Sequence, residues 1–63
     1  LPVHHIIMKT IIEWQDQFGY WRRYGMSHHT PSAFKSATAR AHSTGKRHRL
    51  VNEDGDILDL INP

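Results

Sequence analysis

The side chains that could do chemistry in this chain are mainly cationic, and they gather in the middle of the sequence. No acidic residue lies between Asp16 and Glu53, whereas this interval holds seven of the eight lysines and arginines and four of the six histidines. The residues from Glu53 onward carry four carboxylates and no lysine or arginine. A basic middle with an acidic tail is typical of a polyanion-binding surface, or of two blocks that pair with each other within the fold.

Catalytic and metal-binding patterns are absent from the sequence. It contains no glycine-rich phosphate loop, no nucleophile beside a recognisable base and no paired carboxylates suited to a cleft. Acidic residues flank Gly55, but acids are common beside a turn glycine for conformational reasons alone. The adjacent histidines His4-His5 and His28-His29 are poor joint ligands for one ion, and there is no cysteine. We therefore expect no enzyme, no metal site and no cofactor.

The size of the chain predicts one small domain spanning residues 1–63. A chain of 63 residues buries only about 60% of its surface, so a homodimer is one route to extra stability. Residues 1–7, which precede Met8, are either an extension, foreign to the natural protein or encoded upstream of it, or part of a short strand over residues 2–8. No apolar run approaches the ~20 residues that span a bilayer, so we expect a cytoplasmic protein without a membrane partner.

An apolar stripe at spacings of three and four predicts a first helix over residues 11–24. Its members are Ile11, Trp14, Phe18 and Trp21. Thr10 and Glu13 fit the capping box that starts a helix, and Gly25 fits a left-handed cap at its end.

A second helix is predicted over residues 31–43, with Thr30 as its N-cap, Pro31 at its first position and Gly45 as its stop. Its inner stripe consists of Ala33, Phe34, Ala37 and Ala41. His42 and His48 flank Gly45 and would add positive charge below about pH 6.5.

A β-hairpin is predicted after Gly45, turning at the segment "NEDG". A type I turn at Glu53-Asp54 followed by left-handed Gly55 makes a three-residue loop with a bulge. The register that this turn predicts pairs Asn52 with Asp56, Val51 with Ile57, Leu50 with Leu58, and Arg49 with Asp59. The fold class is therefore α+β: two helices packed on a C-terminal antiparallel β-hairpin, which an N-terminal strand could extend to three strands.

The second half of the chain resembles a winged helix-turn-helix. The segments "TPSAFKSATARAH" and "KRHRLVNEDGDILDL" match its recognition helix and its wing in order, although a usual winged helix has three helices and only two are predicted here. The resemblance implies that Lys35, Ser36, Ala39 and His42 face bases. It also implies that Arg40, Lys46, Arg47 and Arg49 face phosphates.

The leading functional hypothesis is a small nucleic-acid-binding accessory or regulatory protein, with DNA favoured over RNA. The residues assigned to its basic surface are Arg22, Arg23, Lys35, Ser36, Arg40, His42, Lys46, Arg47 and Arg49. Lys46 and Arg47 have no predicted intramolecular partner, whereas Arg49 is expected to pair with Asp59. The alternative is a phage or mobile-element protein that modulates a host protein through Tyr20, Arg23 and Tyr24, because tyrosine and arginine often anchor protein interfaces.

Overall fold

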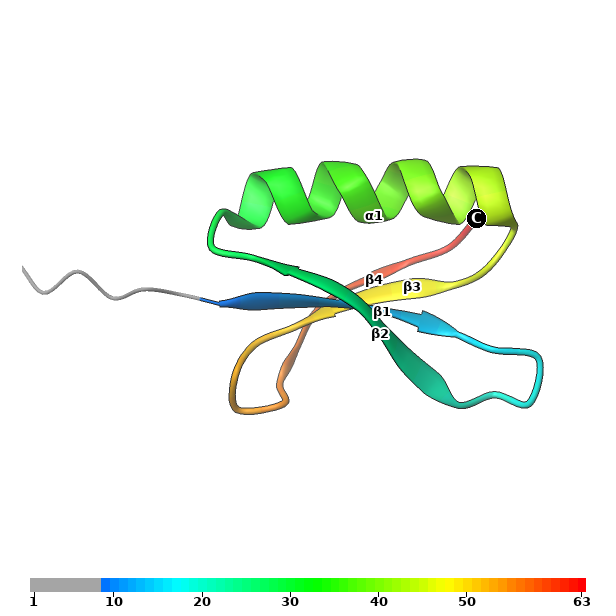
Figure 1. The fold of residues 1–63 in the computed structure, drawn as a ribbon, viewed down its shortest axis with the longest axis horizontal. Coiled ribbons are helices and arrows are strands. Elements are labelled where there is room, and N and C mark those ends of the chain that lie inside the picture. The colour runs from blue at the N-terminus through cyan, green and yellow to red at the C-terminus, as the bar shows by residue number, and fades with distance from the viewer. Residues whose placement is uncertain (1–8) are drawn as a thin grey trace, which may run out of the picture.

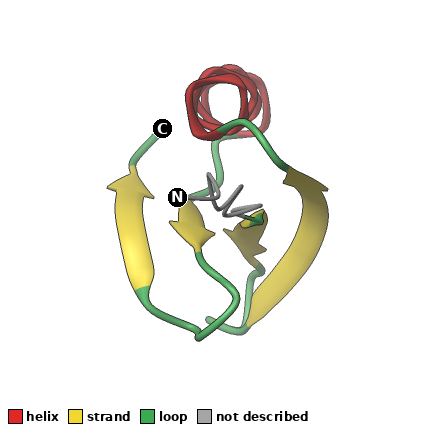
Figure 2. Cartoon of the chain, turned by 90° about the vertical axis from the view of Figure 1, so that its left-hand side faces the viewer, coloured by secondary structure: helices red, strands yellow, loops and turns green. Residues whose placement is uncertain are grey.

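A four-stranded antiparallel sheet with one helix across it is the architecture of this chain in a computed structural model, which describes residues 9–63 (Figure 1). The elements in chain order are β1 (Thr10–Gln15), β2 (Trp21–Ser27), α1 (Thr30–Thr44), β3 (His48–Val51) and β4 (Ile57–Ile61). The sheet order is β2-β1-β3-β4, so two hairpins lie side by side and β1 pairs with β3. Figure 2 shows α1 over one face of the sheet. The α+β class is thus confirmed.

The helix predicted over residues 11–24 is wrong, because this segment forms the β1–β2 hairpin. Burial in β1 follows a period of two: Thr10 and Ile12 are buried, and the residues beside them are less so. β-Branched and aromatic side chains, which suit strands, fill both halves of the segment. The Thr10 hydroxyl contacts the Thr30 hydroxyl at 2.9 Å rather than capping a helix, and Gly25 lies opposite Ile12 within β2.

The described residues hold one helix instead of the expected two, so the predicted two-helix arrangement is wrong and the winged-helix likeness is not confirmed. A winged helix supports its recognition helix on other helices. Here α1 rests on a sheet whose central strand, β1, comes from the part of the chain that was expected to be helical. The strand considered for residues 2–8 falls outside the described residues.

The second predicted helix is confirmed as α1, with a shift of its N-cap by one residue. His29, not Thr30, is the N-cap, and its ring Nδ1 accepts from the backbone N–H of Ser32 at 3.3 Å. Gly45 ends the helix in the left-handed conformation, with φ of 70°, and its N–H donates to the Ala41 carbonyl at 3.0 Å.

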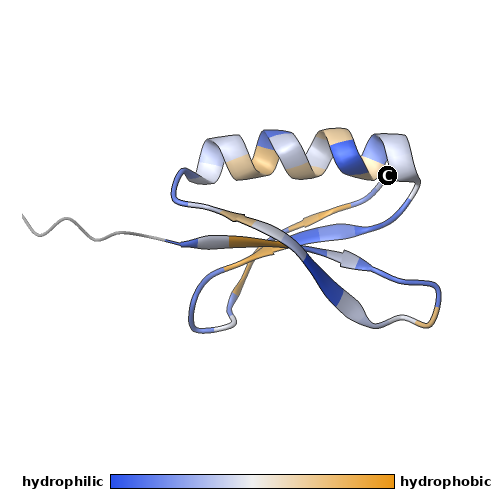
Figure 3. Ribbon diagram, in the orientation of Figure 1, coloured by the Kyte–Doolittle hydropathy of each residue, from blue (hydrophilic) through white to orange (hydrophobic). Residues whose placement is uncertain are grey.

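The core lies where the alanine row of α1 meets the sheet. Its buried members are Ala33, Ala37, Ala41, Ile12, Leu50 and Ile61. Alanine has only a methyl side chain, so the helix backbone can approach the strands closely and pack against them. Phe34, which was assigned to the inner stripe, is 45% exposed instead. Figure 3 shows the resulting alternation of apolar and polar residues along α1.

The β3–β4 turn has the predicted bulged form, but the register changes farther along the hairpin. The Asn52 N–H donates to the Asp56 carbonyl at 3.0 Å, and Val51 pairs with Ile57. A second irregularity then pairs Leu50 with Asp59, so the predicted Leu50–Leu58 pair is wrong. This shift places Ile61 in the buried cluster and leaves Leu58 and Leu60 exposed.

The alanine row yields a test of the packing. Replacing Ala37 with leucine should lower the free energy of unfolding by about 1 to 3 kcal/mol, because the added atoms have no room against the sheet. The matched variant Ala39→Leu changes an exposed residue of the same helix and should stay within about 0.5 kcal/mol. Urea denaturation followed by circular dichroism measures both, and equal losses would contradict this packing.

Candidate nucleic-acid interface

Charge is segregated in this molecule rather than neutralised. All six Asp and Glu side chains of the sequence belong to residues 9–63, yet only two make ion pairs there: Glu13 with Arg49, and Asp16 with Arg22. No carboxylate pairs with the remaining basic residues, which are Lys9, Arg23, Lys35, Arg40, Lys46 and Arg47. Within residues 9–63 the basic block and the acidic tail therefore do not pair with each other, and these six cations have no carboxylate partner there.

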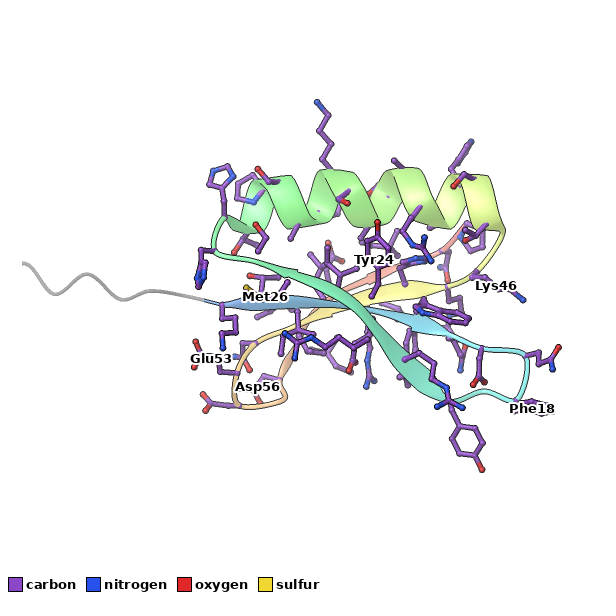
Figure 4. All side chains as sticks on the ribbon, viewed as in Figure 1. Phe18, Tyr24, Met26, Lys46, Glu53 and Asp56 are labelled. Carbon is purple, nitrogen blue, oxygen red and sulfur yellow. The ribbon has the colours of Figure 1, made fainter. Side chains whose placement is uncertain are left out.

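The acidic β3–β4 turn and the basic loop that carries Lys46 lie at opposite ends of the molecule. Figure 4 shows Glu53 and Asp56 at the end formed by the β3–β4 turn, and Lys46 at the far end, after α1. The turn uses its polar side chains internally, because Asn52 Oδ1 accepts from the N–H groups of Asp54 and Asp56. A polyanion would therefore meet attraction at one end and repulsion at the other.

Arg49 has a structural partner that differs from the predicted one. The expected Arg49–Asp59 pair is wrong: Arg49 lies opposite Leu60, and its Nε donates to Glu13 Oε1 of the neighbouring strand at 2.7 Å. Its guanidinium carbon also lies 4.3 Å from the ring centroid of Trp21. The Arg49 side chain is only 23% exposed and lies on the face of the sheet opposite α1. Because Glu13 balances its charge, Arg49 is poorly placed to contact phosphates.

Arg22 is likewise engaged, in the turn that joins β1 to β2. Asp16 Oδ1 accepts from the N–H groups of Phe18 and Tyr20, each at 2.9 Å, while Oδ2 accepts from Arg22 Nε at 2.8 Å. The Arg22 guanidinium, supported by these backbone N–H groups, holds the pKa of the Asp16 carboxyl below its usual 3.8. The turn is therefore built around an ionised aspartate, and the charge of Arg22 is balanced.

Arg40 links α1 to the sheet. Its guanidinium carbon lies 3.9 Å from the ring centroid of Tyr24 in β2. Its Nε is buried with no hydrogen-bond partner in the part of the chain that the structure describes. Arg40 thus covers part of Tyr24, and both residues contribute to attaching the helix to the sheet.

Lys46 and Arg47 occupy the loop between α1 and β3 with exposed side chains and a fixed backbone. The Arg47 carbonyl accepts from the Gln15 N–H at 2.9 Å, which ties this loop to the end of β1. The Lys46 carbonyl accepts from His48 Nδ1 at 2.9 Å. Both cations are therefore presented to solvent from a well-positioned loop, as expected for phosphate contacts.

His48 is a residue whose place sequence reasoning missed. It is fully buried on the helix side of β3, opposite Trp14 and Ile61, and it does not face a ligand. The signal was available, since His48 and Leu50 alternate along the predicted strand and therefore share one face. His42, by contrast, is exposed near the end of α1.

The nine predicted contact residues do not share one face. Arg22, Arg23 and Arg49 belong to the sheet, and Arg23 lies opposite Glu13 on the face away from α1. Five others lie on the exposed side of α1 and in the loop after it. We call these five the helix–loop surface: Lys35, Ser36, His42, Lys46 and Arg47. Because α1 contains no carboxylate along its length, this surface is purely cationic in its charge.

Comparison with protein-family models, curated proteins and solved structures found no match for this chain. Among the described residues, no helix combines the length and the apolar character needed to cross a membrane. No group of three histidine, aspartate or glutamate side chains within residues 9–63 is placed to hold a metal ion.

The Asp16 turn yields a prediction about pH. Its folded-state pKa lies below 3.8, so the ionised carboxylate stabilises the fold at neutral pH. That contribution is lost only as the pH falls through the lowered pKa. A carboxyl-carbon NMR titration should find the Asp16 midpoint below that of an unstructured aspartate. Arg22→Ala should move the midpoint upward, and an unchanged midpoint would contradict the assigned cause.

Two arginines that are two positions apart should differ in their effect on stability. Arg49→Ala removes an ion pair and a contact with Trp21, and should lower the free energy of unfolding by about 1 to 2 kcal/mol. Arg47→Ala removes an exposed side chain of equal charge and should change it by less than about 0.5 kcal/mol. Chemical denaturation measures both. A large loss from Asp59→Ala that matched Arg49→Ala would instead support an Arg49–Asp59 pair.

Proposed function

We propose that this chain is a nucleic-acid-binding protein with an accessory or regulatory role, and that its helix–loop surface contacts phosphates. The observation that carries the proposal is the segregation of charge. Lys35, Lys46 and Arg47 lack a carboxylate partner within residues 9–63, and Lys46 lies at the end of the molecule opposite the acidic turn. Cations that release condensed counterions on binding supply most of the affinity in non-specific nucleic-acid complexes.

The exposed side of α1 supports close approach of a phosphate backbone. Ser36 and Ala39 are small, and both are exposed on the helix beside Lys35. The side-chain bulk that would hold a backbone away from α1 is therefore low. Base recognition by α1 was implied only by the winged-helix resemblance. That resemblance loses its support because residues 11–24 form a hairpin instead of the predicted helix. Phosphate contact remains, and DNA is the first ligand to test, with RNA as the second.

Salt dependence tests this proposal directly. Fluorescence anisotropy with labelled DNA should show an association constant that falls steeply as salt rises, because each phosphate contact releases counterions. Arg47→Ala should reduce the slope of log K against log salt by about 0.7 to 0.9.

Arg23→Ala is the matched control, since it removes the same charge from the sheet face and should leave the slope unchanged. Absence of binding at low salt, or equal effects of the two variants, would contradict the helix–loop surface as the interface.

A second proposal, modulation of a host protein, is favoured by one specific observation. Met26, Ile57 and Leu60 are exposed, and the strand register places them on the sheet face opposite α1. Arg23 lies on that face too, whereas Tyr24 stacks on Arg40 on the helix side, so the predicted set of Tyr20, Arg23 and Tyr24 is divided. Binding that depends on Ile57 and resists salt would favour this function over the first.

A further inference from the structure

Two aromatic rings stand in solvent at the β1–β2 turn. Phe18 is 73% exposed and Tyr20 is 66% exposed. The turn itself needs neither ring: Asp16 supplies its side-chain acceptor, and Gly19 supplies its positive φ of 88°. Neither ring adds to the core. Two large apolar side chains are therefore exposed to solvent without contributing to the turn or the core, which points to a ligand for these rings.

The turn fixes the backbone that carries both rings. The N–H groups of Phe18 and Tyr20 both donate to Asp16 Oδ1, and the Gln15 side-chain amide donates to the Gly19 carbonyl at 3.1 Å. A backbone bond from the Asp16 N–H to the Tyr20 carbonyl, 2.8 Å long, closes the hairpin. Little backbone freedom remains to be lost on binding, so contacts made by the rings keep most of their free energy.

Cations lie at the same end of the molecule as these rings. Figure 4 shows Phe18 and Lys46 at one end, away from Glu53 and Asp56. The bond between the Gln15 N–H and the Arg47 carbonyl places the basic loop one strand from the start of the turn. Gln15 also pairs with Trp21, the residue after Tyr20. The backbones of Arg47 and Tyr20 therefore lie about two strand spacings apart, roughly 10 Å.

We infer that this basic–aromatic end, formed by Phe18, Tyr20, Lys46 and Arg47, binds single-stranded nucleic acid. The rings stack on unpaired bases, and the two cations contact phosphates on either side. This inference rests on the proposed function and goes beyond it by naming the ligand class. A duplex keeps the faces of its bases covered, so it offers the rings no stacking partner.

The composition of the turn favours bases over a lipid surface. Residues 15–20 contain no aliphatic side chain, and their polar members are Gln15, Asp16 and Gln17. Membrane-surface segments gain affinity from a continuous apolar face, which two isolated rings among amides do not provide. Stacking, by contrast, needs only the flat face of each ring.

The test compares four probes at low salt by fluorescence anisotropy or competition. They are a labelled oligothymidylate of about twelve nucleotides, a duplex of equal length, an RNA strand of equal length and inorganic polyphosphate. Oligothymidylate should bind more tightly than the duplex. Tyr20→Ala should weaken oligothymidylate binding by about 5- to 100-fold and leave polyphosphate competition unchanged, because polyphosphate has charge without bases.

Two control variants complete the experiment. Tyr20→Phe keeps a stacking ring and should retain the affinity, and Phe34→Ala removes an exposed ring from α1 and should have no effect. Circular dichroism checks that each variant is folded.

The outcomes separate the two claims. Absence of binding to every probe overturns both the proposed function and this inference. Equal affinity for duplex, polyphosphate and oligothymidylate, with Tyr20→Ala silent, overturns the inference alone. Binding to phosphatidylserine vesicles, added as a fifth probe, with no binding to the oligonucleotides would overturn both claims in favour of a lipid surface.

Discussion

The close contact between the alanine row of α1 and the sheet is the constraint on which the rest of this structure depends. Ala33, Ala37 and Ala41 are almost completely buried against strands that come from both hairpins. Because those side chains are small, the helix lies close to β1 and β3 and closes a core from few residues. Apart from exposed residues such as Phe34 and Ala39, the remaining surface of α1 is polar and basic, and the loop after it is tied to the end of β1 by the bond from the Gln15 N–H to the Arg47 carbonyl.

The topology converts a linear charge pattern into a separation in space. β1 and β3 are central and antiparallel, so the turn after β1 and the loop before β3 lie at one end, and the turn after β3 lies at the other. In each turn a polar side chain accepts hydrogen bonds from the backbone N–H groups of that turn: Asp16 in the β1–β2 turn and Asn52 in the β3–β4 turn. Neither turn therefore draws on the cations of the loop around Lys46.

Local signals in the sequence predicted local structure well. The Thr-Pro start, the alanine stripe and Gly45 located α1, and "NEDG" located the β3–β4 turn, because each depends on neighbouring residues only. The hairpin over residues 10–27 was missed because its apolar residues happen to recur at spacings of three and four, which is the pattern of a helix. The strand period of two was hidden by this spacing. Phe18, counted in the helical stripe, lies at the turn that Asp16 and Gly19 specify.

Long-range pairings could not be read from the sequence. The partner of Arg49 is Glu13, which is 36 residues away and joins it only because β1 inserts beside β3. Neither Lys46 nor Arg47 belongs to the two ion pairs found within residues 9–63. Their nearness to Phe18 and Tyr20 depends on the hairpin, so sequence reasoning that placed a helix there could not combine them into one site.

The most direct test of the account is a residue-resolved map of where nucleic acid binds. A ¹H–¹⁵N NMR titration with oligothymidylate should shift the backbone signals of Phe18, Tyr20, Lys46 and Arg47 and leave those of Glu53 to Asp56 unchanged. The account predicts that these shifts diminish together as salt is raised, since phosphate contacts supply the affinity. Shifts confined to the sheet face around Met26 and Ile57, or at the acidic turn, would contradict it.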